Sequence, residues 1–353
     1  AFGGWVDVAF ASLGQAASAS GFGIVVASLA VATEANTGSK TLGTLSLAFE
    51  FLARSVVGVP AARWASRRGR RVVIAASGLV GAAGASLVAW DLHLGTLILG
   101  CVGVAGVGVA NCVAQQFRFL AAESVTPNHR ARALSLGVAG GVVAAFAGPE
   151  IAKATRDAGS VEFAASFLAM AACYASQTAF ALAVSRDDPV EVADPDAAHS
   201  ASLSLRAIFR RSREARKGAS CVAVAWTAMF LVMSAAPLAI TGGDEGGHSF
   251  DRSATALQYH LIAMFAPGLF GAGDAVRRFG ADAVASAGCA LYLACAFMTY
   301  SYAADRDAAG RYPARTFEDV LIVLGVAWNL TFVAGSAMLV PRAGGEEGEE
   351  RIA

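Results

Sequence analysis

The chain has 353 residues, of which 56% are apolar and only 15% are Asp, Glu, Lys or Arg. A soluble domain usually carries ~25% of these charged residues, so a soluble protein of this length would need a more charged surface. Basic and acidic residues balance at 27 each, and this net charge of zero excludes an electrostatic case for nucleic-acid binding. The composition therefore indicates a protein that lies in a lipid bilayer.

Long stretches almost free of charge follow one another along the chain, and each predicts a transmembrane helix. About 20 helical residues cross a ~30 Å hydrocarbon layer, and a helix satisfies its own backbone hydrogen bonds there. Glu50 and Arg54 interrupt the second stretch, and His93 and His260 interrupt the fourth and the eighth. The ten predicted stretches, in chain order, are residues 8–33, 41–62, 72–90, 92–117, 133–149, 163–185, 218–243, 253–273, 283–304 and 320–341.

Basic residues lie mostly in the loops on one side of these stretches. If the N-terminus is cytoplasmic, the arginine clusters after the second stretch and before the seventh both face the cytoplasm, as the positive-inside rule requires. We therefore expect a multi-pass integral membrane protein with both termini in the cytoplasm.

A polar stretch after the sixth predicted helix begins acidic and ends basic. It divides the helices into six and four, so we expect an N-terminal six-helix bundle (1–185), a cytoplasmic linker (186–217), an incomplete C-terminal four-helix bundle (218–341) and a cytoplasmic tail (342–353). The basic end of the linker either forms an amphipathic helix on the inner leaflet or is a solvated connection.

Patterns typical of enzymes are absent from the sequence. The six cysteines lie inside predicted helices without a CxxC pair, which predicts neither a metal site nor a disulfide framework. The sequence also has no P-loop, HExxH or G-x-S-x-G motif. We expect no enzymatic activity, no cofactor and no metal.

The two halves of the chain share short motifs in the same order. Arginines surround Gly69 after the second predicted helix, and two arginines precede Gly280 after the eighth. Asn111 in the fourth predicted helix and Asn329 in the tenth each follow a nearby glycine and Val-Ala. This repetition indicates a parallel internal duplication, an arrangement found in transporters.

With these features the chain resembles the major facilitator superfamily. The loop around Gly69 is similar to the family's signature Gly-x-x-x-Asp-Arg-x-Gly-Arg-Arg between helices two and three, and Gly280 lies where the family repeats it. The Gly148-Pro149 pair is similar to a motif of its fifth helix. Two positions depart from the signature, since Ser66 replaces the Asp and Ala62 replaces the leading Gly.

The resemblance implies an all-α bundle and a conformational latch on the cytoplasmic side. The residues that match the latch are Arg67, Arg68, Gly69, Arg70 and Arg71, together with Arg118 and Glu123 after the fourth helix. The family has twelve helices, so ten predicted helices imply that the sequence lacks the last two.

Glu50 and Arg54 are the most informative candidate site residues, because they lie one turn apart near the middle of a predicted membrane helix. Each costs ~2.5–3.5 kcal/mol at mid-bilayer, so both are expected to face the bundle interior or a wet cavity. They form either a substrate or proton site, in which Glu50 titrates, or a structural ion pair between helices.

Further candidates are uncharged polar residues in helices that line the central cavity in the family. His260 either binds substrate and relays protons or is a hydrogen-bonded packing residue. The amides either recognise polar groups of the substrate or join helices. These amides are Asn111, Gln115, Gln116 and Asn329.

The sequence thus predicts a transporter of a small solute that works by alternating access, with ion or proton coupling possible in this family. Its expected partners are the solute and the lipid bilayer, and we expect a monomer. A second hypothesis is a truncated, non-transporting relative that acts as a receptor or is inert, and a membrane-embedded enzyme is the third.

Overall fold

The computed structural model describes residues 2–126, 129–185, 210, 212–242, 247–302 and 312–339, and within these ranges the regular structure is helical with no strand. The first half contains α1 (Phe2–Thr37), α2 (Lys40–Arg68), α3 (Arg70–Leu94), α4 (Ile98–Ala114), α5 (Phe117–Glu123), α6 (Arg130–Thr155) and α7 (Ala164–Ala183). The second half contains α10 (Arg213–Thr241), α11 (Phe250–Phe270), α12 (Ala272–Phe279), α13 (Ala281–Tyr302) and α14 (Ala314–Leu339).

The helices confirm an all-α, multi-pass membrane protein. Within the described chain, eight helices are long and apolar enough to cross a membrane by length and composition, counting α4 and α5 as one. The helices α6 and α11 coincide with the remaining two predicted stretches but do not meet the same criterion. The expected number of ten therefore remains a prediction.

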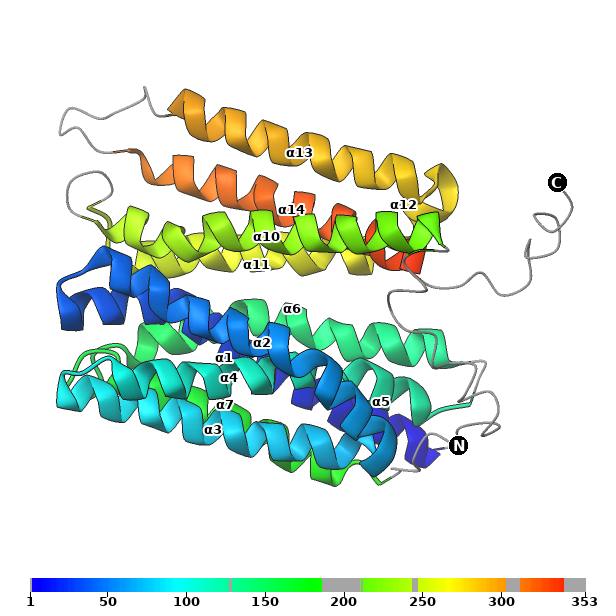
Figure 1. Ribbon diagram of the computed structural model, residues 1–353, viewed down its shortest axis with the longest axis horizontal. Helices are drawn as coiled ribbons and strands as arrows, with labels where there is room; N and C mark the ends of the chain where they lie inside the picture. The colour runs from blue at the N-terminus through cyan, green and yellow to red at the C-terminus, as the bar shows by residue number, and fades with distance from the viewer. Residues whose placement is uncertain are drawn as a thin grey trace, which may run out of the picture.

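The helices form two bundles that lie side by side, α1–α7 in one and α10–α14 in the other (Figure 1). In the first bundle α1 packs against α6 and α7, and α3 packs against α4 and α7. In the second bundle α14 packs against α10, α11 and α13. The bundles meet mainly through α6 and α11 and through α1 and α10.

The predicted domain boundaries are only partly within the described residues. Residues 186–209 and 211 of the expected linker and all of the expected tail lie outside them. The basic residues from Arg213 to Lys217 form the first turn of α10, where the Ser212 side chain caps the helix by accepting from the Ala215 N–H at 3.1 Å. This stretch is thus the start of a long helix that continues into the bundle.

Two glycines with the same backbone conformation support the internal duplication. Gly69 between α2 and α3 has φ 86° and ψ 147°, and Gly280 between α12 and α13 has φ 85° and ψ 153°. Each N–H bonds a carbonyl four residues earlier at 3.0 Å, that of Ala65 or of Val276. Positive φ costs glycine little, so the same residue makes the same sharp turn in both halves. Both turns lie at one end of the molecule, which we call the Gly69 end (Figure 1).

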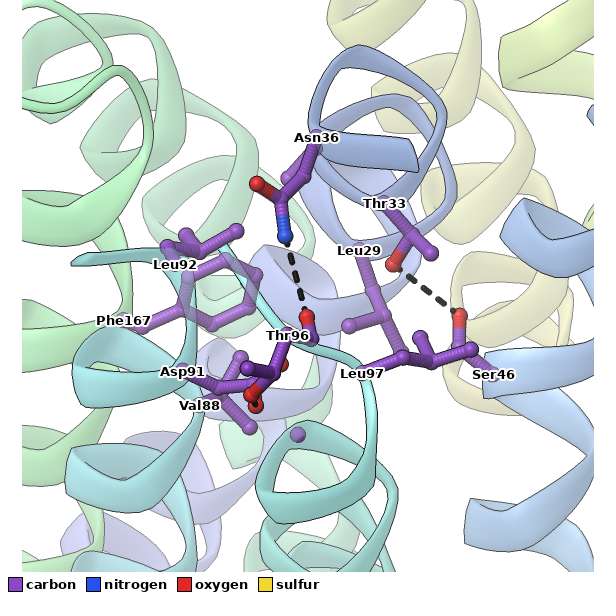
Figure 2. Close-up of a pocket in the computed structure, with 12 residues that line it drawn as sticks. Leu29, Thr33, Asn36, Ser46, Val88, Asp91, Leu92, Thr96, Leu97 and Phe167 are labelled. Atoms are coloured by element: carbon purple, nitrogen blue, oxygen red, sulfur yellow. Dashed lines mark hydrogen bonds between the residues drawn. The ribbon is translucent and has the colours of Figure 1, made fainter. Parts of the chain in front are cut away.

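At the opposite end, which we call the Gly95 end, polar contacts tie the α3–α4 loop to α1 (Figure 2). The Asn36 side chain donates to the Thr96 carbonyl at 3.0 Å, and the Thr96 hydroxyl donates to the buried Asp91 carboxylate. The enclosed space beside them measures about 10 Å³, which is the size of one water molecule. This pocket is too small for a solute, and we assign it to packing.

The bundles also contact each other near the Gly95 end. The rings of Phe163 and Phe250 meet edge to face at 5.0 Å, and the Arg156 guanidinium lies 5.4 Å from the Phe250 centroid. The Gln258 amide donates to Glu150 across the same interface at 3.3 Å. These contacts join the two bundles on this side.

Glycines allow α3 and α4 to approach closely. A Cβ atom at Gly84 would overlap the carbonyl oxygen of Gly103, and one at Gly103 would overlap that of Gly84. Backbone atoms on both sides cannot give way as a flexible side chain could. Small residues at such crossings are a common basis of helix packing in membranes.

We predict that Gly103→Ala destabilises the protein by about 1–3 kcal/mol, because the added methyl group overpacks the α3–α4 crossing. Gly58→Ala in α2 is the matched control, since its Cβ would meet only the Cys112 sulfur at 3.7 Å. That control should be neutral or stabilising, as alanine favours a helix interior. Thermal unfolding in detergent, followed by tryptophan fluorescence, measures both, and equal midpoints would contradict the close approach.

Candidate functional site

A cavity of about 290 Å³ lies between the two bundles at the middle of the helices. Residues of α1, α2, α4, α5 and α6 line it in the first bundle, and residues of α10, α11 and α14 line it in the second. Its size is at the lower limit of the ~300–1,000 Å³ that is typical of small-molecule sites. The cavity reaches past Asn111 to Gln115 and Arg118, toward the Gly69 end of the molecule.

The two walls of the cavity differ in chemistry. The first bundle contributes the polar and basic side chains Gln15, Ser18, Arg54, Asn111, Gln115 and Arg118. The second bundle contributes the aromatic side chains Trp226, Phe265, Trp328 and Phe332. A solute in this cavity therefore contacts mostly polar side chains of the first bundle and mostly aromatic side chains of the second, with Phe22 and Asn329 among the exceptions.

The aromatic wall is ordered by contacts among its own rings. Trp328 and Phe332 stack with centroids 4.6 Å apart and an angle of 9° between their planes. Trp226 meets Trp328 edge to face at 5.1 Å, and Phe265 packs on Trp328 at 6.3 Å. Offset stacks and edge-to-face pairs are the preferred arrangements of aromatic rings, so this wall is preformed.

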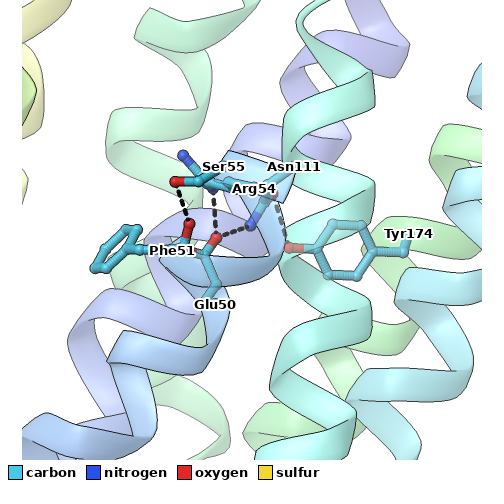
Figure 3. A network of polar contacts seen from close by, with 6 residues as sticks. All are labelled: Glu50, Phe51, Arg54, Ser55, Asn111 and Tyr174. Carbon is cyan, nitrogen blue, oxygen red and sulfur yellow. Dashed lines mark hydrogen bonds and ion pairs between the residues drawn. The ribbon is translucent and has the colours of Figure 1, made fainter. Parts of the chain in front are cut away.

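On the opposite wall, Glu50 and Arg54 form an ion pair within α2 (Figure 3). The Arg54 Nε donates to Glu50 Oε1 at 2.7 Å, as their spacing of one helical turn predicts. The Glu50 side chain is fully buried, and that of Arg54 is 16% exposed and lines the cavity. Because the partner comes from the same helix, the pair does not itself join two helices, contrary to the structural alternative considered for it.

A polar network extends from this pair to two other helices (Figure 3). The Asn111 amide on α4 donates to Glu50 Oε1 at 2.9 Å, and the Tyr174 hydroxyl on α7 donates to Asn111 Oδ1 at 2.9 Å. Gly108 makes the approach possible, since a Cβ there would overlap the Glu50 carbonyl oxygen. The network thus links the cavity to the core of the first bundle.

Arg54 also contacts aromatic rings. Its guanidinium lies 4.6 Å from the centroid of Phe22 on α1. This cation–π contact and the Glu50 carboxylate together compensate the charge of Arg54 in an apolar surrounding.

The structure separates Arg118 from Glu123. The two residues are five positions apart on α5, so their side chains point about 140° apart around the helix axis. Arg118 lines the cavity, whereas Glu123 accepts from Arg70 Nε at 3.0 Å through both oxygens. The two residues predicted together as part of the latch therefore do not pair with each other, because Arg118 lies at the cavity and Glu123 at Arg70.

Gln116 belongs to the same network as Arg70, because its side-chain oxygen accepts from Arg70 Nη1 at 3.0 Å. Arg71 donates to the Leu182 carbonyl at 2.7 Å, which ties the loop to the end of α7. Arg67 and Arg68, in the last turn of α2, are exposed. The predicted latch residues thus fall into a bonded part at the start of α3 and an exposed part at the end of α2.

His260 does not line the central cavity. It is fully buried on α11, and its Nδ1 lies 2.8 Å from the Leu321 carbonyl of α14. Among the predicted candidates, Arg54, Asn111, Gln115 and Asn329 share the cavity, and Glu50 lies directly behind Arg54.

Sequence reasoning about polar residues did not identify the aromatic wall or Tyr174 as site residues. Aromatic side chains are ordinary in apolar helices, and only the rotation of each helix decides whether a ring faces lipid or the cavity. The one signal available was the placement of Trp328 beside Asn329 near the middle of a predicted helix.

A family model described as the Major Facilitator Superfamily matches residues 8–348. The chain is 31% identical over 336 residues to the riboflavin transporter RfnT of Brucella anthropi, covering 94% of this chain and 80% of that protein. It is 24% identical over 292 residues to the uncharacterized MFS-type transporter YdeG of Bacillus subtilis, covering 79% of this chain and 64% of that protein.

Solved structures share the fold at low sequence identity. The xylose transporter XylE from E. coli, in a partially occluded inward open conformation, matches with a TM-score of 0.62 at 12% identity, over 96% of this chain and 84% of that chain. A D-xylose-proton symporter matches with a TM-score of 0.63 at 14% identity, over 96% of this chain and 81% of that chain. At these identities the likeness concerns the fold alone.

We predict that Arg70→Ala lowers the stability of the Gly69 end more than Arg67→Ala does, because only Arg70 bonds Glu123 and Gln116. Exposed ion pairs contribute about 1 kcal/mol or less, so the shift in the thermal midpoint should be small but larger for Arg70→Ala. Thermal unfolding of both variants in detergent measures it. Equal shifts would show that the bonds at Arg70 do not stabilise this end.

Proposed function

The chain belongs to the major facilitator superfamily and transports a small solute across a membrane, and we propose that this solute is a planar heteroaromatic molecule of the flavin class. The observation that carries the proposal is the central cavity, in which the stacked rings of Trp328 and Phe332 line the same space as Arg54 and Asn111. A flat conjugated ring fits the first surface, and its hydroxyl and carbonyl groups fit the second.

The relative at 31% identity supports this substrate class, since it is a riboflavin transporter and aligns with 94% of this chain. Riboflavin combines a fused planar ring with a polyhydroxylated side chain. In the cavity the ring would lie against the aromatic wall. The side chain would reach amides such as Gln15 and Gln115, which donate and accept hydrogen bonds.

We further propose that transport proceeds by rocking of one bundle against the other around this cavity. The bundles touch through Phe163 and Phe250 near the Gly95 end, whereas the cavity extends toward the Gly69 end. We assign the Gly69 end to the cytoplasm from the distribution of basic residues, so the shape corresponds to an inward-facing state. One chain supplies both walls of the cavity, which supports a monomer as the working unit.

We predict that liposomes containing the purified protein accumulate riboflavin, and that Phe332→Leu weakens this uptake. Loss of the Phe332 ring removes a stacking surface worth about 0.5–1.5 kcal/mol beyond its burial, which raises the half-saturating concentration up to about tenfold. The matched control is Phe297→Leu on α13, a side chain that is 69% exposed and does not line the cavity. Absence of uptake by the wild-type protein would contradict the substrate class, and equal effects of the two variants would contradict the site.

A second proposal concerns coupling, and it rests on the Glu50 carboxylate. Its Oε1 accepts from both Arg54 and Asn111, while Oε2 is buried without a hydrogen-bond partner among the described residues. Oε2 can therefore take up a proton without breaking either bond to Oε1. We propose that Glu50 is the group through which a proton gradient drives transport.

We predict that Glu50→Gln abolishes the dependence of uptake on a pH gradient while exchange of solute across the membrane continues. Glutamine keeps the size of the side chain but cannot carry a proton. Glu214→Gln at the start of α10 is the control, since that carboxylate is 55% exposed and does not line the cavity. Uptake in liposomes with and without a pH gradient measures the effect, and an unchanged pH dependence would rule out Glu50 as the coupling group.

A further inference from the structure

The charge at the surface of the central cavity is of one sign. Among the described residues that line it, the charged ones are Arg54 and Arg118, and none is Asp, Glu or Lys. The Arg54 guanidinium is compensated by Glu50, whose fully buried carboxylate lies behind it at 2.7 Å. A solute in the cavity therefore meets positive charge that is only partly compensated by the protein.

The charge of Arg118 has no such compensation. No carboxylate of the residues that the structure describes pairs with it, because Glu123, on the same short helix, pairs with Arg70 at 3.0 Å. The Arg118 guanidinium instead lies 4.8 Å from the centroid of the Phe119 ring. A cation that is partly removed from water gains from a nearby anion, since the attraction is strong in a surrounding of low dielectric constant. Arg118 therefore favours an anionic group in the cavity.

A solute can reach Arg118, because this residue is not sealed inside the protein. Arg118 is partly exposed, and Gln115, one turn before it, is exposed. Both residues line the cavity on the side of the Gly69 end. An anionic group at this position would thus contact the guanidinium of Arg118 and the amide of Gln115 together.

The distance between the two arginines follows from the helix that connects them. Asn111, Gln115 and Arg118 are four and three residues apart, so they form a row along one helix face. Gln115 keeps a near-helical backbone at the end of α4, with φ −59° and ψ −13°. Arg54 and Asn111 bond the same oxygen of Glu50 and therefore lie at one level. At ~1.5 Å per residue, Arg118 lies about 10 Å farther toward the Gly69 end.

We propose that the transported solute is an anionic member of the proposed heteroaromatic class, and that Arg118 binds its negative group. The flat ring lies against the aromatic wall at the level of Arg54, and the anion lies about 10 Å away at the end of the side chain. The terminal nitrogens of a guanidinium donate to the oxygens of such a group. This inference rests on the proposed function and adds the charge of the solute and its specificity-determining residue.

The test compares riboflavin with riboflavin 5′-phosphate, which has the same ring and side chain but ends in a phosphate. Binding to the purified full chain in detergent is followed by quenching of flavin fluorescence, which both ligands share. The wild-type protein is expected to bind the phosphate ester on the order of tenfold more tightly, as a hydrogen-bonded charge pair predicts. A neutral flavin still stacks on the aromatic wall but leaves Arg118 without an anion.

Substitutions of Arg118 separate its charge from its packing. Arg118→Met keeps most of the side-chain volume and should bind the two flavins with nearly equal affinity, while riboflavin itself binds as it does to the wild-type protein. Arg118→Lys should keep part of the preference for the phosphate ester, because it returns the charge without the fork of the guanidinium. Arg67→Met is the matched control, since Arg67 is exposed in the last turn of α2 and does not line the cavity. Its preference should equal that of the wild-type protein.

The outcomes distinguish this inference from the proposed function. If riboflavin binds and the phosphate ester binds no more tightly, the anion site is overturned and the flavin class stands. An equal loss of preference in Arg118→Met and Arg67→Met would also overturn it, because the preference would then come from the general charge of the Gly69 end. If neither flavin binds, the proposed substrate class fails and the inference fails with it. The ligand comparison in the wild-type protein needs no substitution, so a variant that does not fold cannot obscure the result.

Discussion

The fold depends on one constraint, which is that a backbone in hydrocarbon must satisfy its own hydrogen bonds. An α-helix satisfies this constraint, so the remaining free-energy cost in the bilayer comes from burying charged and polar side chains. Glu50 and Arg54 lower that cost for each other through their ion pair, and Asn111 adds a hydrogen bond to the carboxylate. Two further helices of the first bundle contact this pair or its partner. Gly108 brings α4 against the Glu50 backbone, and Tyr174 fixes the Asn111 amide from α7.

Glycine has a second role in this structure, which is to form the same backbone turn in both halves of the chain. Gly69 and Gly280 share a backbone conformation that other residues rarely adopt, and each ends one helix and starts the next. The duplicated turn places both loops at the same end of the molecule. The contacts around the two loops nevertheless differ. Arg70 after Gly69 bonds Glu123 within the first bundle, whereas in the second bundle Lys217 at the start of α10 bonds Asp282 after Gly280. Repetition of the turn therefore does not require repetition of its side-chain contacts.

The sequence predicted the helical class, the family and the Glu50–Arg54 pair, because apolar length and a spacing of four residues act locally along one helix. It also identified Asn111, Gln115 and Asn329, which do share the cavity. It did not predict that Arg118 lines the cavity, since that depends on the turn between α4 and α5. The aromatic wall was missed for a related reason. The composition of a helix does not fix its rotation, and the rotation alone brings Trp226, Phe265, Trp328 and Phe332 to one surface.

The division of the cavity into two walls has a mechanical consequence for the proposed alternating access. The polar wall and Arg118 belong to the first bundle, while the aromatic wall and Asn329 belong to the second. A solute that stacks on one wall and bonds the other contacts both bundles at once, so its binding energy is largest when the bundles are close. A solute that contacts only one wall gains little binding energy when the bundles close. It therefore does not favour the closed state, because a ligand shifts a conformational equilibrium only by its differential affinity for the two states. The same arrangement that selects the solute would therefore also favour the closed intermediate through which it passes.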